Sequence, residues 1–319
     1  MNQNVDLVCI GMALVDSIIR GFDPEPVSAS GYRAESGSIH VGGEAVNEAI
    51  AAARLGVRTG ILCSLGEDEA GDLITGALQR CGVDTGRILR SAEHATPVTT
   101  MFVREDGTRR SITNGAHRYN FRPDLHTELF RDAKALILGS LFRAPFDDPA
   151  IIHAVLQAAK VAGQTVFADT KLPNFRALSL DDLRDSLPLL DGIFPNEDEA
   201  RHYTGETEPE AMADGFLRYG VGSVVVKLGG AGCLYKDARE TIRLSACDID
   251  AVDATGAGDC FLAGFTSARL RGAGPAEALR FANACGALCA AAVGASAGLR
   301  SREQVLAFME THALKEEPI

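Results

Sequence analysis

Short apolar runs alternate with longer segments of helical periodicity from residue 125 onward, and this alternation limits the folds open to the chain. The apolar runs lie at 135–139, 164–168 and 192–194, and the segment at 149–162 has the spacing of a helix. Strands that alternate with helices predict a doubly wound, mostly parallel sheet with helices on both faces. We expect the run at 5–10 to be the first, central strand of this α/β sheet.

Two segments break the alternation and predict a small second sheet. Residues 17–41 contain several Pro and Gly residues without a helical period, and residues 96–119 contain a β-rich run, a turn at 105–107 and a returning strand. We therefore divide the chain into a large domain, 1–16, 42–95 and 120–319, and a β-sheet lid, 17–41 and 96–119. The candidate lid contacts to a ligand are Phe102, Arg104, Arg109 and His117.

A glycine-rich turn near the C-terminal end predicts an anion site. Gly256, Ala257 and Gly258 lie between a strand-like run at 244–252 and a long apolar helix, and Asp259 falls on the first helical turn. Glycines let a phosphate approach the backbone, and a helix start directs unpaired N–H groups and the positive end of its dipole toward it. Asp259 can accept the proton of an attacking hydroxyl, although an Asp here is also an ordinary helix cap. Its pKa is expected to be low because of the dipole.

Polar residues near the N-terminal end predict a substrate site. Asp16 follows the first strand, where open α/β sheets bind ligands, and can accept hydrogen bonds from paired hydroxyls. Gly42 and Gly43 start an Ala-rich helix, and Asn47, one turn in, can both donate and accept. Lys171, close behind the run at 164–168, can reach a phosphate or a substrate carboxylate.

These stretches resemble, in family order, the signatures of the PfkB (ribokinase-like) carbohydrate kinases. The pattern G-G-x-x-x-N starts at Gly42, and the D-T-G-A-G-D core is interrupted only by Ala254. The resemblance implies a ribokinase-like fold and an ATP-dependent sugar kinase that moves the γ-phosphoryl group of MgATP, with Asp259 as base and the backbone N–H groups of residues 257–259 as anion hole. It also implies a homodimer formed through the lid.

The resemblance extends to the nucleotide and ion sites. The N-x-x-E spacing of Asn196 and Glu199 suits a Mg²⁺ ion held through water. The implied nucleotide contacts are Asn196, Lys227, Gly229, Gly232 and Asn283, the last beside the adenine. Asp253 and Thr255 are candidate ligands of a monovalent cation, K⁺.

Bulk properties exclude several other classes. A net charge of −12 argues against a nucleic-acid partner, and the uncharged stretch at 281–299 is too rich in small residues for a bilayer span. The eight cysteines form no C-x-x-C pair, and no signal peptide precedes the first strand, so we expect a cytoplasmic protein. The sequence has no GxGxxG pattern after the first strand, so it does not support a nicotinamide dehydrogenase.

The substrate stays open at this stage. The chain has Lys171 where the family often has Asn, and Glu44-Ala45 where strict ribokinases usually have Lys-Gly. Fructokinase-like, 2-keto-3-deoxygluconate-kinase-like and nucleoside-kinase-like substrates are therefore all compatible with the sequence. A non-catalytic sugar- or nucleotide-binding protein of the same fold is the alternative from another class.

Overall fold

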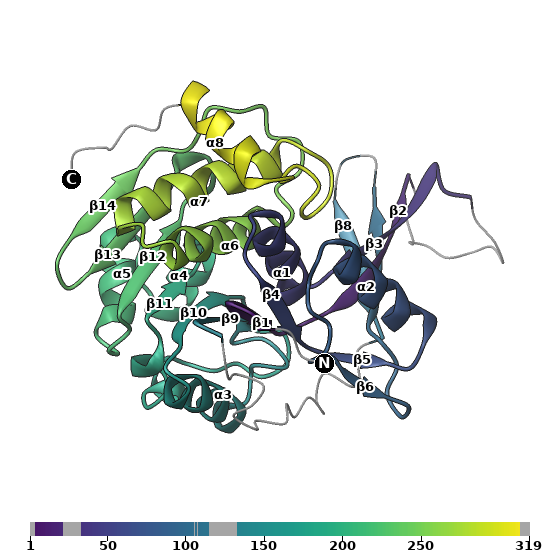
Figure 1. Ribbon diagram of the computed structural model, residues 1–319, viewed down its shortest axis with the longest axis horizontal. Helices are drawn as coiled ribbons and strands as arrows, with labels where there is room; N and C mark the ends of the chain where they lie inside the picture. The colour runs from purple at the N-terminus through teal and green to yellow at the C-terminus, as the bar shows by residue number, and fades with distance from the viewer. Residues whose placement is uncertain (1–3, 22–32, 105, 107, 115–132, 313–319) are drawn as a thin grey trace.

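The computed structural model describes residues 4–21, 33–104, 106, 108–114 and 133–312. Its main sheet has eight strands, in the order β14-β13-β12-β11-β10-β9-β1-β4 (Figure 1). Six of them run parallel: β4 (Thr59–Leu62), β1 (Leu7–Ile10), β9 (Ala135–Leu141), β10 (Thr165–Thr170), β11 (Gly192–Phe194) and β12 (Ser223–Lys227). The antiparallel strands β13 (Cys233–Asp237) and β14 (Thr241–Leu244) complete one edge. The predicted mostly parallel α/β sheet is confirmed, but β1 lies next to the edge strand β4 and not at the centre.

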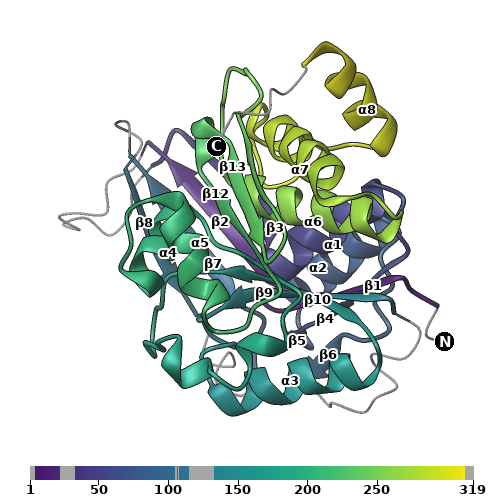
Figure 2. The ribbon, with the colours of Figure 1, turned by 90° about the vertical axis from the view of Figure 1, so that its left-hand side faces the viewer.

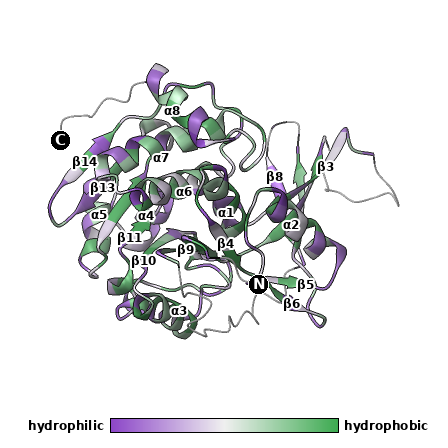
Figure 3. Ribbon diagram, in the orientation of Figure 1, coloured by the Kyte–Doolittle hydropathy of each residue, from purple (hydrophilic) through white to green (hydrophobic). Residues whose placement is uncertain are grey.

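Helices cover both faces of this sheet (Figure 1 and Figure 2). One group is α1 (Glu44–Arg54), α2 (Glu69–Arg80), α6 (Ala257–Leu270), α7 (Pro275–Ala290) and α8 (Arg302–Thr311). The other is α3 (Pro149–Val161), α4 (Glu197–Thr204) and α5 (Pro209–Leu217), with the 3-10 turns η3 (Asp181–Leu183) and η4 (Leu187–Leu189). Alternate side chains of β1 enter the two cores, Leu7 and Cys9 on the α6 side and Val8 and Ile10 on the α3 side. Burial on both faces explains why the central strands are largely apolar, green in Figure 3.

A second, four-stranded sheet projects beside the main domain (right in Figure 1). Its order is β3 (Ser36–Gly42), β2 (Leu14–Arg20), β7 (Val98–Val103) and β8 (Arg109–Thr113). The predicted lid segments were 17–41 and 96–119, whereas β2 starts at Leu14. Asp16 therefore lies within a strand of this sheet and not in a turn after β1.

The register of the second sheet separates its two faces. Ile39, Ser17, Thr100 and Ile112 are aligned in one row across all four strands, and Ile39 and Ile112 are 67% and 71% exposed. The neighbouring row contains Asp16, Thr99 and Thr113. Because adjacent residues of a strand point to opposite faces, these two rows face in opposite directions.

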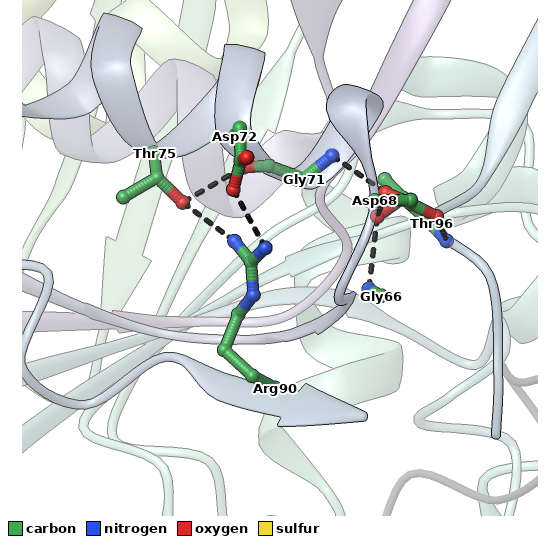
Figure 4. A network of polar contacts seen from close by, with 7 residues as sticks. All are labelled: Gly66, Asp68, Gly71, Asp72, Thr75, Arg90 and Thr96. Carbon is green, nitrogen blue, oxygen red and sulfur yellow. Dashed lines mark hydrogen bonds and ion pairs between the residues drawn. The ribbon is translucent and has the colours of Figure 1, made fainter. Parts of the chain in front are cut away.

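A polar network ties the start of α2 to the entry of the second sheet (Figure 4). Asp68 caps α2 by accepting a 2.8 Å hydrogen bond from the Gly71 N–H, and it also accepts from the Thr96 N–H at 2.7 Å and the Thr96 hydroxyl at 2.6 Å. Thr96 precedes β7 and accepts from the Gly66 N–H at the end of β5 (Ser64–Gly66), which pairs with β6 (Leu89–Ser91). These bonds fix the angle at which the chain enters β7.

The strand-like run predicted at 244–252 is wrong, because β14 ends at Leu244 and residues 245–256 are irregular. Their backbone groups find partners outside a sheet. The Asn283 amide donates to the Ser245 carbonyl at 2.9 Å, and the N–H groups of Val252 and Asp253 donate to the Ala290 carbonyl. No helix of the described ranges is long and apolar enough to cross a membrane.

Candidate active site

A cavity of about 1010 Å³ lies between the carboxyl ends of the main-sheet strands and the second sheet. Many of the predicted site residues line it together: Asp16, Gly43, Asn47, Lys171, Asn196, Lys227, Gly229, Gly232, Thr255, Gly256, Ala257, Gly258, Asp259 and Asn283. Gly42, Glu199 and Asp253 are outside this lining.

The start of α6 forms one wall of the cavity. Gly256 is the N-cap with φ of 76°, and a β-carbon there would come within 1.9 Å of the Ala295 carbonyl oxygen, so that only glycine fits. The Ala257 N–H donates to the Ala254 carbonyl at 3.2 Å, which corrects the expectation that it is free to bind an anion. The N–H groups of Gly258 and Asp259 have no acceptor among the described residues.

Asp259 is buried on the first turn of α6 and accepts a 2.7 Å hydrogen bond from the Asn47 amide. Its pKa is raised from 3.8 to about 6, mainly by burial, although Lys171 lowers it. The expected low pKa is therefore wrong, because loss of solvent outweighs the helix dipole. A carboxylate with this pKa is ionised at neutral pH and is a competent general base.

Two lysines balance the acidic groups around Asp259. Lys227 Nζ lies 2.6 Å from Asp169 Oδ1, and a β-carbon on Gly258 would come within 3.1 Å of that ammonium, so Lys227 lies beside the α6 turn. Burial alone would lower the pKa of Lys171. The negative charges of Asp169, Asp259 and Glu44 have the larger combined effect and raise that pKa well above its usual range. Lys171 therefore keeps its positive charge in the cavity wall.

The end of β9 and the loop after it contribute residues that the sequence analysis missed. Ser140 and Arg143 line the cavity, and Ser140 and Phe142 have the left-handed φ values of 73° and 72°. Such backbone strain is concentrated at functional sites. Phe142 stacks on Tyr203 with ring centroids 4.0 Å apart, and the Tyr203 hydroxyl donates to the Lys171 carbonyl at 2.6 Å. The position after a strand end was the only sequence signal for this loop.

The second sheet contributes Thr99, Met101, Ser111 and Thr113 to the cavity, along with Asp16. These residues share one face by strand alternation, which places Phe102 on the opposite face. Phe102, Arg104 and Arg109 are outside the cavity lining. Phe102 is on the face turned away from the cavity, whereas Arg109 shares the face of Ser111 and Thr113 and helps to lower the pKa of Asp253, so a ligand contact of Arg109 stays a prediction. His117 lies outside the described residues. Counting every second residue from Asp16 along the paired strands would have found Thr99, Met101, Ser111 and Thr113, and the same count includes Arg109.

Asp16 faces the main domain from β2. Burial raises its pKa, with a further rise from Glu44 and a decrease from His40. A β-carbon on Gly42 would come within 2.4 Å of the Asp16 carboxylate, and one on Gly43, where φ is 96°, within 2.4 Å of the Met12 carbonyl oxygen. Both glycines therefore give space to groups at the cavity edge.

The far side of the cavity has the residues expected at a nucleotide. Asn196 and Glu199 form a capping box at the start of α4, and Glu199 Oε2 also accepts a 2.8 Å hydrogen bond from Thr170. Burial raises the pKa of Glu199. Gly229 starts the turn η5 (Gly229–Ala231), and Gly232, with φ of 97°, packs on the Leu244 carbonyl, so the backbone itself borders the cavity.

Asp253 stabilises the loop behind the α6 turn. Its carboxylate accepts from the Thr255 N–H at 3.0 Å and the Gly294 N–H at 3.2 Å. Burial raises the pKa of Asp253, but these hydrogen bonds outweigh it and lower the pKa below 3.8.

Residues 5–302 match the family model described as pfkB family carbohydrate kinase. The chain belongs to this family. The predicted recognition is thereby confirmed, and the protein is a carbohydrate kinase, an enzyme that phosphorylates an alcohol group.

Individual family members are similar along nearly the whole chain. A 2-dehydro-3-deoxygluconokinase of Bacillus subtilis is 30% identical over 87% of this chain and 91% of its own length. The structure of Arabidopsis thaliana ribokinase complexed with ribose and ATP superposes with a TM-score of 0.84 at 29% identity, covering 97% of this chain and 99% of that one. A proposed ribokinase II of E. coli, in complex with ATP and Mg²⁺, has a TM-score of 0.77 at 27% identity over 97% of this chain and 100% of that one. These similarities confirm the ribokinase-like fold with a small lid sheet.

Proposed function

We propose that this carbohydrate kinase transfers the γ-phosphoryl group of ATP to a substrate hydroxyl, with Asp259 as the general base. The observation that carries the proposal is the convergence at one point of the Asp259 carboxylate, two free N–H groups of the α6 turn and the Lys227 ammonium. Asp259 accepts the hydroxyl proton as the new O–P bond forms and the bond from the phosphorus to the ADP oxygen breaks. The N–H groups of Gly258 and Asp259 stabilise the charge on the transferring oxygens.

The remaining roles divide between the two sides of the cavity. Asp16 and Asn47 bind substrate hydroxyls, with Gly42 and Gly43 giving space. On the other side, the backbone at Gly229 and Gly232 borders the phosphates, and the nucleotide is also contacted by Asn196, Lys227 and Asn283.

Metal ions fit this site indirectly. Glu199 Oε2 is occupied by the capping box and Thr170, so Glu199 has Oε1 left to hold a water of Mg²⁺, with Asn196 exposed in the wall beside it. When bound, Mg²⁺ neutralises charge on the ATP phosphates. Asp253 and Thr255 are candidates for a K⁺ loop, since the ordered carboxylate behind the α6 turn has a lowered pKa and is ionised.

The cavity charges favour a sugar acid as substrate. Arg143 and Lys171 both line the cavity and have no ion pair with a carboxylate in the described part of the chain. Two unpaired cations beside a hydroxyl-binding carboxylate suit a ligand that has both hydroxyls and a carboxylate. The similarity to a 2-dehydro-3-deoxygluconokinase points the same way. A neutral sugar or a nucleoside would offer Arg143 no carboxylate and would leave Lys171 with only the acidic groups of the protein around it.

ATP consumption with matched pairs of sugar acids and neutral sugars tests the proposal, with nucleosides and polyols in the same panel and with K⁺ present or absent. We expect the best kcat/KM with an acid, and we expect Lys171→Met to raise KM for the acid without changing KM for ATP. A rise in KM for ATP alone would assign Lys171 to the nucleotide. Turnover of neutral sugars or nucleosides only would refute the sugar-acid assignment.

The outer face of the lid supports a homodimer. Ile39 and Ile112 are exposed at the two ends of one row on the face that is turned away from the cavity. A second copy of the lid would cover both. Replacement of both by Ser should convert a dimer to a monomer in analytical ultracentrifugation, and a wild-type monomer would contradict this assignment.

A further inference from the structure

Three buried carboxylates meet beneath the cavity floor, and one of them has no role in the proposed reaction. Oxygen atoms of Glu48, Asp169 and Asp259 all lie within 4.8 Å of one another. Glu48, on α1, is 0% exposed and does not line the cavity, so it is one layer below Asp259.

Hydrogen-bond partners are missing at this point. Both Glu48 oxygens and Asp169 Oδ2 are buried without a partner among the residues that the structure describes, whereas the other oxygen of Asp169 pairs with Lys227. A buried carboxylate without a partner is strongly destabilising when it is ionised. A single proton on Glu48 removes its charge, and the O–H that results has carboxylate oxygens of Asp169 and Asp259 within 4.8 Å as potential acceptors.

The balance of charges around the cluster also favours a protonated, neutral Glu48. Asp169 is paired with Lys227, and Asp259 lies in the field of Lys171. No cation pairs with Glu48 in the described ranges, and a third ionised carboxylate would leave the cluster with an excess negative charge. The groups that face Glu48 are Cys9 on β1, Glu44 on α1, Asp169 on β10, Lys227 on β12 and Asp259 on α6, and of these only Lys227 is cationic.

We propose that Glu48 is a neutral carboxylic acid in the working enzyme and that its proton is shared with the carboxylates of Asp169 and Asp259. Glu48 is thus a positioning residue: it donates a hydrogen bond that orients the acidic pair, and it withholds a third charge from the phosphoryl-transfer site. This inference rests on the proposed role of Asp259. Burial, with further contributions from Asp259 and Asp169, raises the pKa of Glu48 well above its usual range, in agreement with it.

A divalent cation held directly by the three carboxylates is the competing explanation. The Lys227 ammonium 2.6 Å from Asp169 and the nearby charge of Lys171 oppose a cation there. The backbone of Gly139 also lies close to Glu48 and leaves little space for an ion there, since a β-carbon on Gly139 would come within 3.0 Å of Glu48 Oε2.

Infrared difference spectra of the apo protein and of Glu48→Gln at neutral pH test the inference directly. We expect a carboxylic-acid C=O band in the wild type that is absent from Glu48→Gln. In urea unfolding, the folding equilibrium constant of the wild type should fall relative to that of Glu48→Gln by up to about tenfold per pH unit above the ordinary carboxyl pKa. Absence of the band, or parallel pH dependences, would overturn the inference. Both readouts are independent of whether Asp259 is the base.

Kinetic measurements on Glu48 variants then distinguish a positioning role of this residue from a role in packing alone. Glu48→Gln retains an N–H donor, so it should keep kcat within about threefold and leave the acid limb of the pH dependence of kcat/KM unchanged. Glu48→Leu lacks the donor and should move that limb to higher pH. A limb that moves to lower pH in Glu48→Gln would mean that Glu48 is charged in the wild type. Mg²⁺ alone, without ATP, should shift Tm of the wild type and Glu48→Gln equally, and a shift confined to the wild type would indicate a bound metal.

Discussion

The Asn47 amide donates a 2.7 Å hydrogen bond to Asp259 Oδ2 across a sequence separation of 212 residues. The bond connects the first turn of α1 to the first turn of α6, and these helices pack side by side in the same core. One carboxylate oxygen is thereby fixed, and we propose that the other accepts the substrate proton. The same amide lines the cavity, so in the proposed mechanism it positions the base and borders the substrate.

Asp259→Asn should reduce kcat by a factor of about 10²–10⁴ with little change in the substrate KM, because the amide occupies the same space but cannot accept a proton. Steady-state kinetics check this, and MgATP binding by calorimetry is the control for an intact nucleotide site. Turnover close to that of the wild type would refute the assignment of the base.

The pH dependence of kcat/KM should have an acid limb near the pKa of Asp259, which is about 6. Asp259 is active when ionised, so the rate rises with pH through this value. For stability the sign is opposite: the raised folded-state pKa means that stability is lost as pH rises from the ordinary value of 3.8 to about 6. We therefore expect Asp259→Asn to unfold at a higher urea concentration than the wild type at neutral pH. A lower unfolding midpoint would contradict the raised pKa.

Lys227→Met should destabilise the fold by about 3–5 kcal/mol, because it leaves the Asp169 carboxylate buried without its cation. Urea unfolding at neutral pH measures the change. The double variant Lys227→Met/Asp169→Asn is the matched control and should recover much of the loss. If the double variant is no more stable than Lys227→Met, the ion pair does not account for the effect.

Gly256→Ala should greatly impair both folding and activity, since the new β-carbon would come within 1.9 Å of the Ala295 carbonyl oxygen. Gly82→Ala is the control, because Gly82 has a similar φ of 79° but no atom within 4 Å of the added carbon. It should lose only about 1–2 kcal/mol from the left-handed backbone and keep full kcat. Equal losses in the two variants would show that backbone strain alone, and not contact with Ala295, matters.

Asp68→Ala removes the cap of α2 together with both bonds to Thr96, and should cost about 1–3 kcal/mol. Because Thr96 leads into β7, we also expect a higher substrate KM. Glu67→Ala, at an exposed neighbour, should change neither quantity. A loss of stability with an unchanged KM would mean that the network supports α2 without positioning the lid sheet.

The sequence predicted the fold and much of the cavity because both depend on local patterns. Apolar runs and glycine turns determined the strands and the α6 start, and carboxyl ends of parallel strands meet at one edge. Glu48 could not be found in this way, since it lies in an Ala-rich helix and its environment depends on two other elements. Phe102 was misplaced because strand register decides which face it occupies. The pKa of Asp259 was misjudged because burial is a tertiary property.

Asp16 lies on a strand of the lid sheet, whereas Asn47 and Asp259 lie on helices of the main domain. A sugar bound by all three would hold the two parts of the enzyme together. The arrangement of the site would then depend on whether a sugar is bound. A water molecule cannot make all the contacts of a sugar, so we expect it to be a poorer phosphoryl acceptor. We therefore expect the division of one binding site between two sheets to limit ATP hydrolysis when no sugar is bound.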